Sequence, residues 1–267
     1  MSTYVITGAA SGIGAATKAR LEADGHQVVG IDLRDADVEV DLGTTEGIAQ
    51  AVAGVRELVD AIDGFAPIAG IAPSAGRSGQ QLVAVNYFGA VDLLEGLRPL
   101  LAAGTDPSVV LLSSNSTTTQ PHWPTELAEA CVAGDREGAG AIADGFGDLS
   151  AITAYPASKA ALAYYARTRA ADYLTSGIRL NAVAPGFIDT PMTQEALKDP
   201  LTAQAIQEFL ATVPAGRGGR PEEVASLIAY LLGPESTYVV GSVLFVDGGL
   251  DASLRGLDWP KVWQPGA

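Results

Sequence analysis

The sequence predicts a single doubly wound α/β domain, in which a parallel sheet of about seven strands has helices on both faces. Strand-like and helix-like runs alternate along most of the chain, which is the pattern of successive βαβ units. The strand-like runs are almost continuously apolar, as expected for strands buried on both sides. The 267 residues are 48% hydrophobic and 18% charged, which fits one globular domain.

The first βαβ unit is complete within about 30 residues. A strand over Thr3–Thr7 leads through a glycine-rich turn into a helix over 15–23, which Gly25 ends, and a second strand follows over 27–31. Further strands are predicted at 38–40, 68–73, 109–112, 179–184 and 239–246, and further helices at 44–60, 82–101, 157–174 and 221–232. We expect this domain to span residues 1–250.

Composition excludes several classes of function. Acidic residues outnumber basic ones by 31 to 16, which disfavours a nucleic-acid partner because phosphates attract clustered Lys and Arg. One cysteine, Cys131, cannot form an internal disulfide, and with two histidines the chain lacks the common zinc ligand sets, so no metal is predicted. Without a long apolar run or a basic signal segment, we expect a cytoplasmic protein with no membrane partner.

The turn after the first strand has the composition of a phosphate site. Gly8, Gly12 and Gly14 are spaced Gly-x-x-x-Gly-x-Gly, with Ser11 and Ile13 between them. Glycines at such a turn let main-chain N–H groups and the positive end of the helix approach a phosphate. A tight turn without a ligand is the alternative.

Asp32 ends the second strand and favours a nucleotide over that alternative. A carboxylate at this place can accept both ribose hydroxyls of adenosine and would repel a 2′-phosphate. The expected cofactor is therefore NAD. Arg34, two residues further on, keeps NADP open, since an arginine there can bind a 2′-phosphate.

Of the eight tyrosines, only Tyr155 is followed four positions later by a lysine, Lys159. On a helix these two positions share a face. A nearby ammonium, together with a cationic nicotinamide, favours the phenolate and would lower the pKa of Tyr155 towards the range useful for acid–base chemistry. The alternative is an interfacial aromatic beside a lysine that reaches solvent.

The motif Thr7-Gly8 with Gly12-Ile13-Gly14, combined with Tyr155 and Lys159, resembles the compact short-chain dehydrogenases/reductases over nearly the whole chain. The resemblance implies a Rossmann-type domain. It also implies contacts to the cofactor, which are placed at Gly8, Ser11, Gly12, Ile13, Gly14, Asp32, Asp41, Leu42, Ala75, Gly76, Tyr155, Lys159, Pro185, Gly186, Ile188 and Thr190. Asp41 and Leu42 would contact the adenine, and Ser74-Ala75-Gly76 stands where the family has Asn-Ala-Gly.

The resemblance further implies the catalytic residues Ser114, Tyr155, Lys159 and Asn86. Tyr155 would exchange the hydroxyl proton, Ser114 would steady the alkoxide, Lys159 would bind the ribose, and Asn86 would hold a water in the proton relay. Ser113 is the alternative to Ser114. Asn86 could equally be a buried polar group bonded to the main chain.

The segment 115–151 departs from the compact pattern by placing Ser114 and Tyr155 41 residues apart, far more than is usual in the family. Short helices are predicted at 125–133 and 135–143. Between 120 and 150, six acidic residues against one arginine suggest a solvent-facing flap over the active site.

This departure and the stretch 85–90 resemble one subgroup, the bacterial 3α-hydroxysteroid dehydrogenase/carbonyl reductases. It implies a hydrophobic, cyclic secondary alcohol or ketone as substrate, steroid- or terpenoid-like, with 187–214 as a substrate loop. Trp123 and Phe187 are candidate pocket walls.

A homodimer or homotetramer is implied, in which the insertion obstructs the family's usual four-helix contact. In the tail, 251–267, Trp259 and Trp263 either cover a pocket or a subunit seam, or belong to a disordered end.

The function predicted is that of an NAD-dependent oxidoreductase acting on such an alcohol. An NADP-dependent carbonyl reductase and a non-catalytic NAD(H) sensor of the same fold are the alternatives. A sensor has no need of Ser114, Tyr155, Lys159 and Asn86 together. A dehalogenase of related fold is disfavoured, because it would be expected to lose the glycines and to replace Lys159 by arginine.

Overall fold

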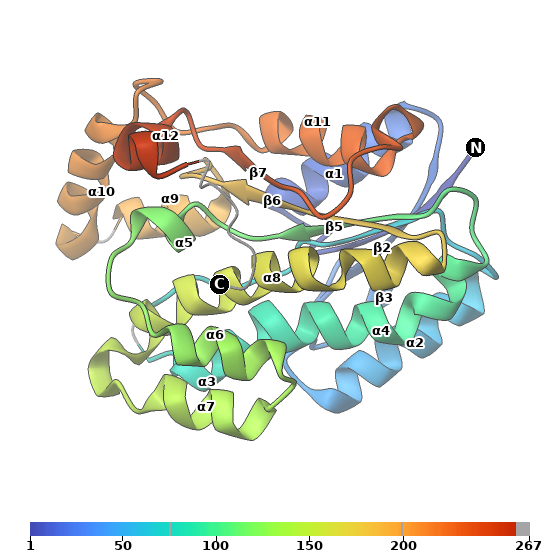
Figure 1. The fold of residues 1–267 in the computed structure, drawn as a ribbon, viewed down its shortest axis with the longest axis horizontal. Coiled ribbons are helices and arrows are strands. Elements are labelled where there is room, and N and C mark those ends of the chain that lie inside the picture. The colour runs from blue at the N-terminus through green and yellow to red at the C-terminus, as the bar shows by residue number, and fades with distance from the viewer. Residues whose placement is uncertain (75, 199, 260–267) are drawn as a thin grey trace.

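The computed structural model describes residues 1–74, 76–198 and 200–259. Seven parallel strands form one sheet in the order β3-β2-β1-β4-β5-β6-β7 (Figure 1). They are β1 (Thr3–Thr7), β2 (Gln27–Asp32), β3 (Val38–Glu39), β4 (Gly64–Pro67), β5 (Ser108–Leu112), β6 (Arg179–Pro185) and β7 (Val243–Val246). The predicted parallel sheet is confirmed.

The chain winds outward from β1 in both directions, because β2 and β3 lie on one side of it and β4 to β7 on the other. The connections that leave the carboxyl ends of β1 and β4 therefore diverge. In parallel α/β sheets this switch point is where ligands bind.

Helices cover both faces of the sheet, as predicted (Figure 1). On one face α1 (Gly12–Ala23) packs against α11 (Pro221–Leu232). On the other lie α2 (Thr45–Leu58), α4 (Gly89–Ala102) and α8 (Ser150–Thr175), over the larger of the two apolar cores. In the part of the chain that the structure describes, no helix is long and apolar enough to cross a membrane.

The insertion contains α5 (Ser116–Thr119) and the two predicted helices, which are confirmed as α6 (Thr125–Val132) and α7 (Arg136–Asp144). α6 packs on α8, and α7 packs on α3 (Gly79–Val83). Leu127, Cys131 and Ala143 are fully buried there. A Cβ on Gly79 would lie 2.7 Å from the carbonyl oxygen of Ala143, so the two helices touch through main chain.

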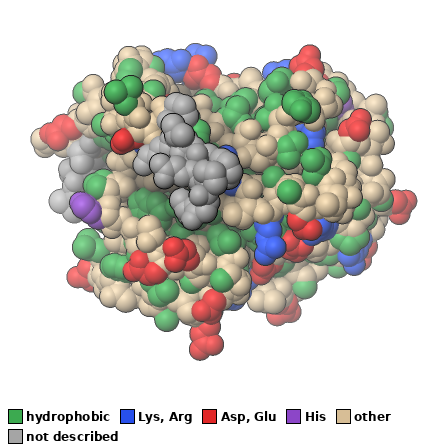
Figure 2. Space-filling view, in the orientation of Figure 1, with side chains coloured by type: hydrophobic (Ala, Val, Ile, Leu, Met, Phe, Trp, Pro, Cys, Tyr) green, Lys and Arg blue, Asp and Glu red, His purple; other side chains and the backbone are tan. Residues whose placement is uncertain are grey.

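The insertion was expected to form a flap over the active site. Its helices α6 and α7 instead pack on α8 and α3 as an added layer. Acidic side chains do lie over α6 and α7 on the surface that Figure 2 shows. Arg136 fixes the start of α7: it forms an ion pair with Asp92 at 2.5 Å, and its guanidinium carbon lies 4.3 Å from the ring centre of Phe88. The acidic excess thus belongs to the solvated face of a packed element.

Two elements lie elsewhere than predicted. β4 occupies Gly64–Pro67 instead of 68–73, and β7 begins at Val243 instead of 239. The sequence of β4 contains a glycine and a proline, which are both rare in strands, and this conceals it.

The helix predicted at 82–101 begins at Gly79 and contains a π-helical turn, Ala84–Phe88, between α3 and α4. The segment 187–214, for which no element was predicted, contains α9 (Pro191–Lys198) and α10 (Pro200–Thr212).

Helix α8 begins at Ser150, seven residues before the predicted start, and continues through Pro156. A proline has no N–H to donate to the carbonyl four residues earlier, which here belongs to Ile152. The side-chain amide of Gln120 donates to that oxygen instead, at 3.1 Å. This bond replaces the missing helical one, and Tyr155 lies inside α8.

The C-terminal segment forms α12 (Leu250–Arg255) and a single 3-10 turn, Gly256–Asp258. Trp259 is 62% exposed. Trp263 lies outside the described residues.

Candidate active site

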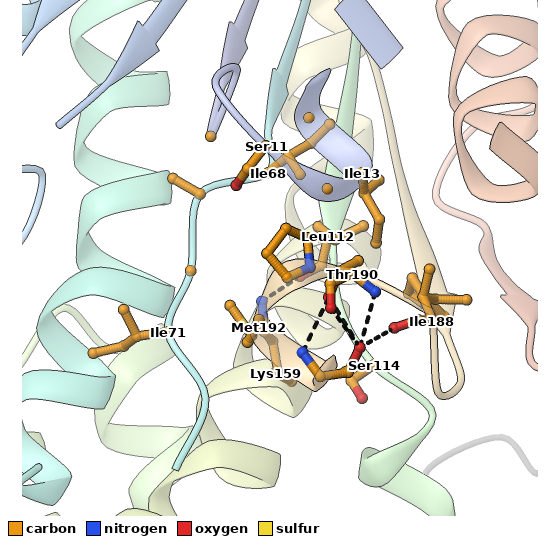
Figure 3. Close-up of a pocket in the computed structure, with 18 of the residues that line it drawn as sticks. Ser11, Ile13, Ile68, Ile71, Leu112, Ser114, Lys159, Ile188, Thr190 and Met192 are labelled. Carbon is orange, nitrogen blue, oxygen red and sulfur yellow. Dashed lines mark hydrogen bonds between the residues drawn. The ribbon is translucent and has the colours of Figure 1, made fainter. Parts of the chain in front are cut away.

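A cavity of about 820 Å³, including its solvent-open part, lies at the carboxyl ends of the central strands (Figure 3). Figure 3 shows side chains that line it from five elements: Ser11 and Ile13 at the start of α1, Ile68 and Ile71 after β4, Leu112 and Ser114 at the end of β5, Lys159 on α8, and Ile188, Thr190 and Met192 after β6. The switch point of the sheet is therefore hollow.

The glycine-rich turn forms one end of this cavity. Gly8 and Gly12 have φ angles of +69° and +54°, and a Cβ on Gly14 would lie 2.0 Å from the carbonyl oxygen of Gly8. Ser11, at the N-cap of α1, makes no side-chain cap bond. The first N–H groups of α1 thus remain open to an anion, and the turn fits a dinucleotide phosphate.

Asp32 faces a neighbouring hollow that shares Ser11 with the main cavity. Its two carboxylate oxygens accept main-chain N–H bonds from Ala10 at 3.0 Å and from Leu33 at 2.7 Å. These bonds fix the carboxylate beside the phosphate turn, where an adenosine ribose would lie. Arg34 lines the same hollow.

Asp41 and Leu42 are absent from the lining of both hollows. One carboxylate oxygen of Asp41 accepts the N–H of Gly43 at 2.8 Å, and Leu42 is buried in the larger core. The predicted adenine contacts of Asp41 and Leu42 stay a prediction.

At the other end of the cavity lie Ser114 and Tyr155. The Ser113 hydroxyl donates to the main-chain oxygen of Lys159 at 2.8 Å, so it is engaged in holding β5 to α8. The Ser114 oxygen accepts the N–H of Ser116 at 3.1 Å, and the Ser114 hydroxyl is near enough to the Tyr155 side chain to lower the Tyr155 pKa. Of the two serines, Ser114 is the one that faces Tyr155.

The electrostatics of Tyr155 differ from the expectation. Burial raises the pKa of Tyr155 above its ordinary value, and the hydrogen bond with Ser114 opposes this shift. The ammonium nitrogen of Lys159 lies 6.0 Å from the ring centre of Tyr155 and donates to the carbonyl of Leu112 at 2.9 Å. Burial lowers the pKa of Lys159 itself to about 8. Lys159 and Ser114 alone thus do not lower the pKa of Tyr155 below its ordinary value, although the sequence predicts this effect of Lys159.

Asn86 lies in the π-helical turn and is fully buried. Its side chain accepts the N–H of Ile71 at 2.8 Å and donates to the Ile71 carbonyl at 3.0 Å. A Cβ on Gly70 would lie 3.0 Å from the Asn86 side-chain oxygen and 3.5 Å from the Lys159 nitrogen. Asn86 therefore holds the segment after β4, and Gly70 lets it approach Lys159.

These contacts correct the place of the Ala-Gly pair. Gly76 is exposed, has open space around its Cα, and does not line the cavity, while Ala75 lies outside the described residues. Ala69 and Gly70 line the cavity instead, and the Ala69 N–H donates to the Thr7 hydroxyl at 2.9 Å. The misplaced β4 explains the error, because the pair that matters follows the strand directly.

At the end of β6 and in the segment that follows it, the predicted residues Pro185, Gly186, Ile188 and Thr190 all line the cavity. Thr193, which the sequence did not suggest, fixes this segment. Its hydroxyl donates to the Ile188 carbonyl at 2.7 Å and accepts the Thr190 N–H at 2.9 Å.

The two candidate pocket walls do not line this cavity. The Trp123 indole donates to the Thr117 carbonyl at 3.0 Å and packs against the larger core. Phe187 lines a separate hollow that includes Arg217 and Asp247.

Comparison with known proteins agrees with this geometry. A family model described as short chain dehydrogenase matches residues 2–125, and one described as Enoyl-(Acyl carrier protein) reductase matches residues 145–251. Over 256 residues, 96% of this chain and 98% of the relative, the chain is 43% identical to a 3-alpha-hydroxysteroid dehydrogenase/carbonyl reductase of Comamonas testosteroni. It is 34% identical over 258 residues, 93% of this chain and 96% of the relative, to a cis-4-hydroxycyclohexanecarboxylate dehydrogenase of Sinomonas cyclohexanicum.

Among solved structures, the 3-alpha-hydroxysteroid dehydrogenase of Pseudomonas sp. B-0831, complexed with NADH, matches with a TM-score of 0.88 and 43% identity. The match covers 95% of this chain and 98% of that one.

Proposed function

This chain belongs to the short-chain dehydrogenase family, and we propose that it is an NAD-dependent oxidoreductase acting on a hydrophobic, cyclic secondary alcohol or its ketone, steroid- or terpenoid-like. The observation that carries the proposal is that Ser114, Tyr155 and Lys159 line one cavity together with the glycine turn of α1. Reduction of a ketone needs a binding site for the dinucleotide that carries the hydride, next to a group that donates a proton to the ketone oxygen.

NAD is the proposed cofactor because the Asp32 carboxylate is held in place beside the phosphate turn. A 2′-phosphate would meet this negative charge at close range. When bound, the nicotinamide supplies or accepts the hydride. Lys159, whose ammonium is fixed by the Leu112 carbonyl, is the proposed partner of the nicotinamide ribose, and Ile188 and Thr190 of the carboxamide.

Proton transfer is assigned to Tyr155. Because burial raises its pKa, the phenol is protonated at neutral pH and can donate to the oxygen of a ketone. In the reverse direction it must accept a proton, so alcohol oxidation is expected to accelerate as the pH rises. Ser114 is proposed to steady the developing alkoxide, and Asn86 to order a water near Lys159.

The substrate class rests on the lining of the cavity. Ile71, Leu112, Ile188 and Met192 present apolar surface, and Met192 is 44% exposed at its rim. The segment 187–214 is the proposed substrate loop. The names of both relatives refer to alcohols on rings, which agrees with this proposal.

The proposed assembly is a homodimer or homotetramer. α6 packs on α8, and α7 on α3, so the helices that usually pair in the family have an added layer beside them. Light scattering gives the oligomeric state, and a structure that shows the ordinary four-helix contact would contradict the obstruction.

The experiment that tests the function is a panel of cyclic and aromatic secondary alcohols with NAD, followed by the absorbance of NADH. We expect turnover with ring-bearing alcohols and a higher kcat/KM with NAD than with NADP. A clear preference for NADP would overturn the cofactor proposal. Cofactor binding without turnover of any alcohol or ketone would favour the non-catalytic sensor.

A further inference from the structure

We propose that Asp251 is a positioning residue, which ties the C-terminal helix α12 to α5 and thereby fixes the hydroxyl of Ser114. The inference rests on the proposed function, since it concerns the serine of that site. Thr118 lies on α5, only four residues after Ser114, while Asp251 lies 133 residues further along the chain. Their contact therefore joins the segment that follows Ser114 to the C-terminal helix α12.

Helix α5 cannot hold its own shape. It has only four residues, Ser116–Thr119, and so short a helix is unstable without tertiary contacts. Its first N–H, that of Ser116, donates to the Ser114 oxygen at 3.1 Å. The direction in which the Ser114 hydroxyl points therefore depends on where α5 is held.

Asp251 supplies the charged contact that holds α5. Its side chain accepts the Thr118 hydroxyl at 2.5 Å and forms a two-pronged pair with Arg255, at 2.6 and 2.8 Å. The residue is 8% exposed. Burial alone would raise the pKa of Asp251, but the bonds from Arg255 and Thr118 outweigh it and hold the pKa below its ordinary value. The carboxylate is therefore charged throughout the usual assay range, and charge-assisted bonds of this kind are the stronger ones.

Neighbouring contacts continue the same connection. Asp247 accepts the N–H of Asp251 at 2.7 Å and lies 3.4 Å from the side-chain nitrogen of Asn115. A Cβ on Gly186 would lie 2.8 Å from the Cα of Asp247. The segments that follow β5, β6 and β7 thus meet here, and Figure 1 shows α12 and α5 on the same side of the molecule.

The first test replaces Asp251 by asparagine and, from the other side of the same bond, Thr118 by valine. We expect each variant to lower kcat about tenfold, with the KM for NAD changed less than twofold, because the cofactor turn lies on another segment. Asp24→Asn is the matched control. Asp24 also pairs with an arginine four residues away, Arg20, at 2.8 Å, but at the C-terminal end of α1. The kcat of the Asp24→Asn variant should equal that of the wild type.

A double variant separates positioning from a loss of stability. In a Ser114→Ala enzyme, Asp251→Asn should cause little further loss of kcat, since the group it positions is gone. A full tenfold loss in that background would overturn the proposal, as would unchanged kcat in both single variants.

Hydrogen exchange of the peptide 113–120 gives a readout independent of turnover. We expect faster exchange in the Asp251→Asn protein and unchanged exchange in the Asp24→Asn protein. If the wild type turns over no alcohol, the proposed function fails. Hydrogen exchange would then still test whether Asp251 holds α5. Equal exchange rates in the wild type and the Asp251→Asn protein would overturn that link.

Discussion

The two ends of the cavity are built from different parts of the chain. At the nucleotide end, Gly8, Gly12 and Gly14 shape the main chain, and the N–H groups at the start of α1 are the proposed ligands of the phosphate. At the reactive end, Ser114 and Tyr155 present side chains: the Ser114 oxygen accepts a main-chain N–H, and the Tyr155 phenol lies in buried surroundings. Substitutions that add volume should therefore impair the nucleotide end, and substitutions that remove a single polar group should impair the reactive end.

The largest effect is expected at the reactive end, from Tyr155→Phe. Removing one hydroxyl should lower kcat about 1,000-fold, because a positioned general acid contributes about 10² to 10⁴. The Kd for NADH, measured by fluorescence, should stay within about twofold of the wild type. Tyr164→Phe is the control, since Tyr164 lies on the same helix but is 41% exposed. Residual turnover near the wild-type rate would show that another group moves the proton.

Between the two ends lies Gly70, where added volume should affect chemistry. In Gly70→Ala the new methyl group would press on the Asn86 side-chain oxygen at 3.0 Å and touch the Lys159 nitrogen at 3.5 Å, and we expect about a tenfold lower kcat. Gly76→Ala is the matched comparison. Its φ of +81° costs roughly 1 kcal/mol of stability, but its surroundings are open, so kcat should not change. A lower kcat in Gly76→Ala than in Gly70→Ala would show that Gly76, and not Gly70, belongs to the site.

The smallest effect concerns stability, in Lys159→Met. The pKa of Lys159 is lowered from 10.5 to about 8, so the folded protein carries a buried ammonium below pH 8 and is penalised for it. The unfolded chain binds this proton more tightly between about pH 8 and 10.5, and the stability contributed by this group therefore rises with pH in that window.

Inactive Lys159→Met, which lacks the ammonium, should thus be more stable than the wild type at pH 6.5 by about 2 kcal/mol, after allowance for the lost bond to Leu112. The difference should shrink at pH 9.5. Urea unfolding at the two pH values measures it, and a variant less stable than the wild type at pH 6.5 would contradict the stated cause of the pKa shift.

Much of the fold could be predicted because its elements carry clear end signals. β1 and α11 have the predicted bounds. β1 is an apolar run that ends before Gly8, and α11 is an apolar run that begins at Pro221 and ends before Gly233. β4 was missed because Gly64 and Pro67 oppose strand propensity and only pairing with β1 and β5 makes them a strand. That one shift also moved the Ala-Gly pair from 69–70 to 75–76.

The site was predictable where a role depends on local spacing, as in the glycine turn and in the Tyr155–Lys159 pair, whose members the structure brings to one cavity. It was not predictable where partners are distant in sequence. Thr193 acts through the main chain of a loop whose shape the sequence does not specify. The bond between Thr118 and Asp251 joins a four-residue helix to a segment that was predicted as a tail.

The most direct test of the central claim follows the transferred hydrogen. NADH deuterated at C4 of the nicotinamide, one face at a time, is incubated with cyclic ketones, and the alcohols are analysed by mass spectrometry. We predict that one of the two deuterated forms delivers one deuterium to the carbinol carbon, and that Tyr155→Phe abolishes this transfer. Alcohol formed without deuterium from either form, or no oxidation of NADH with any ketone, would contradict it.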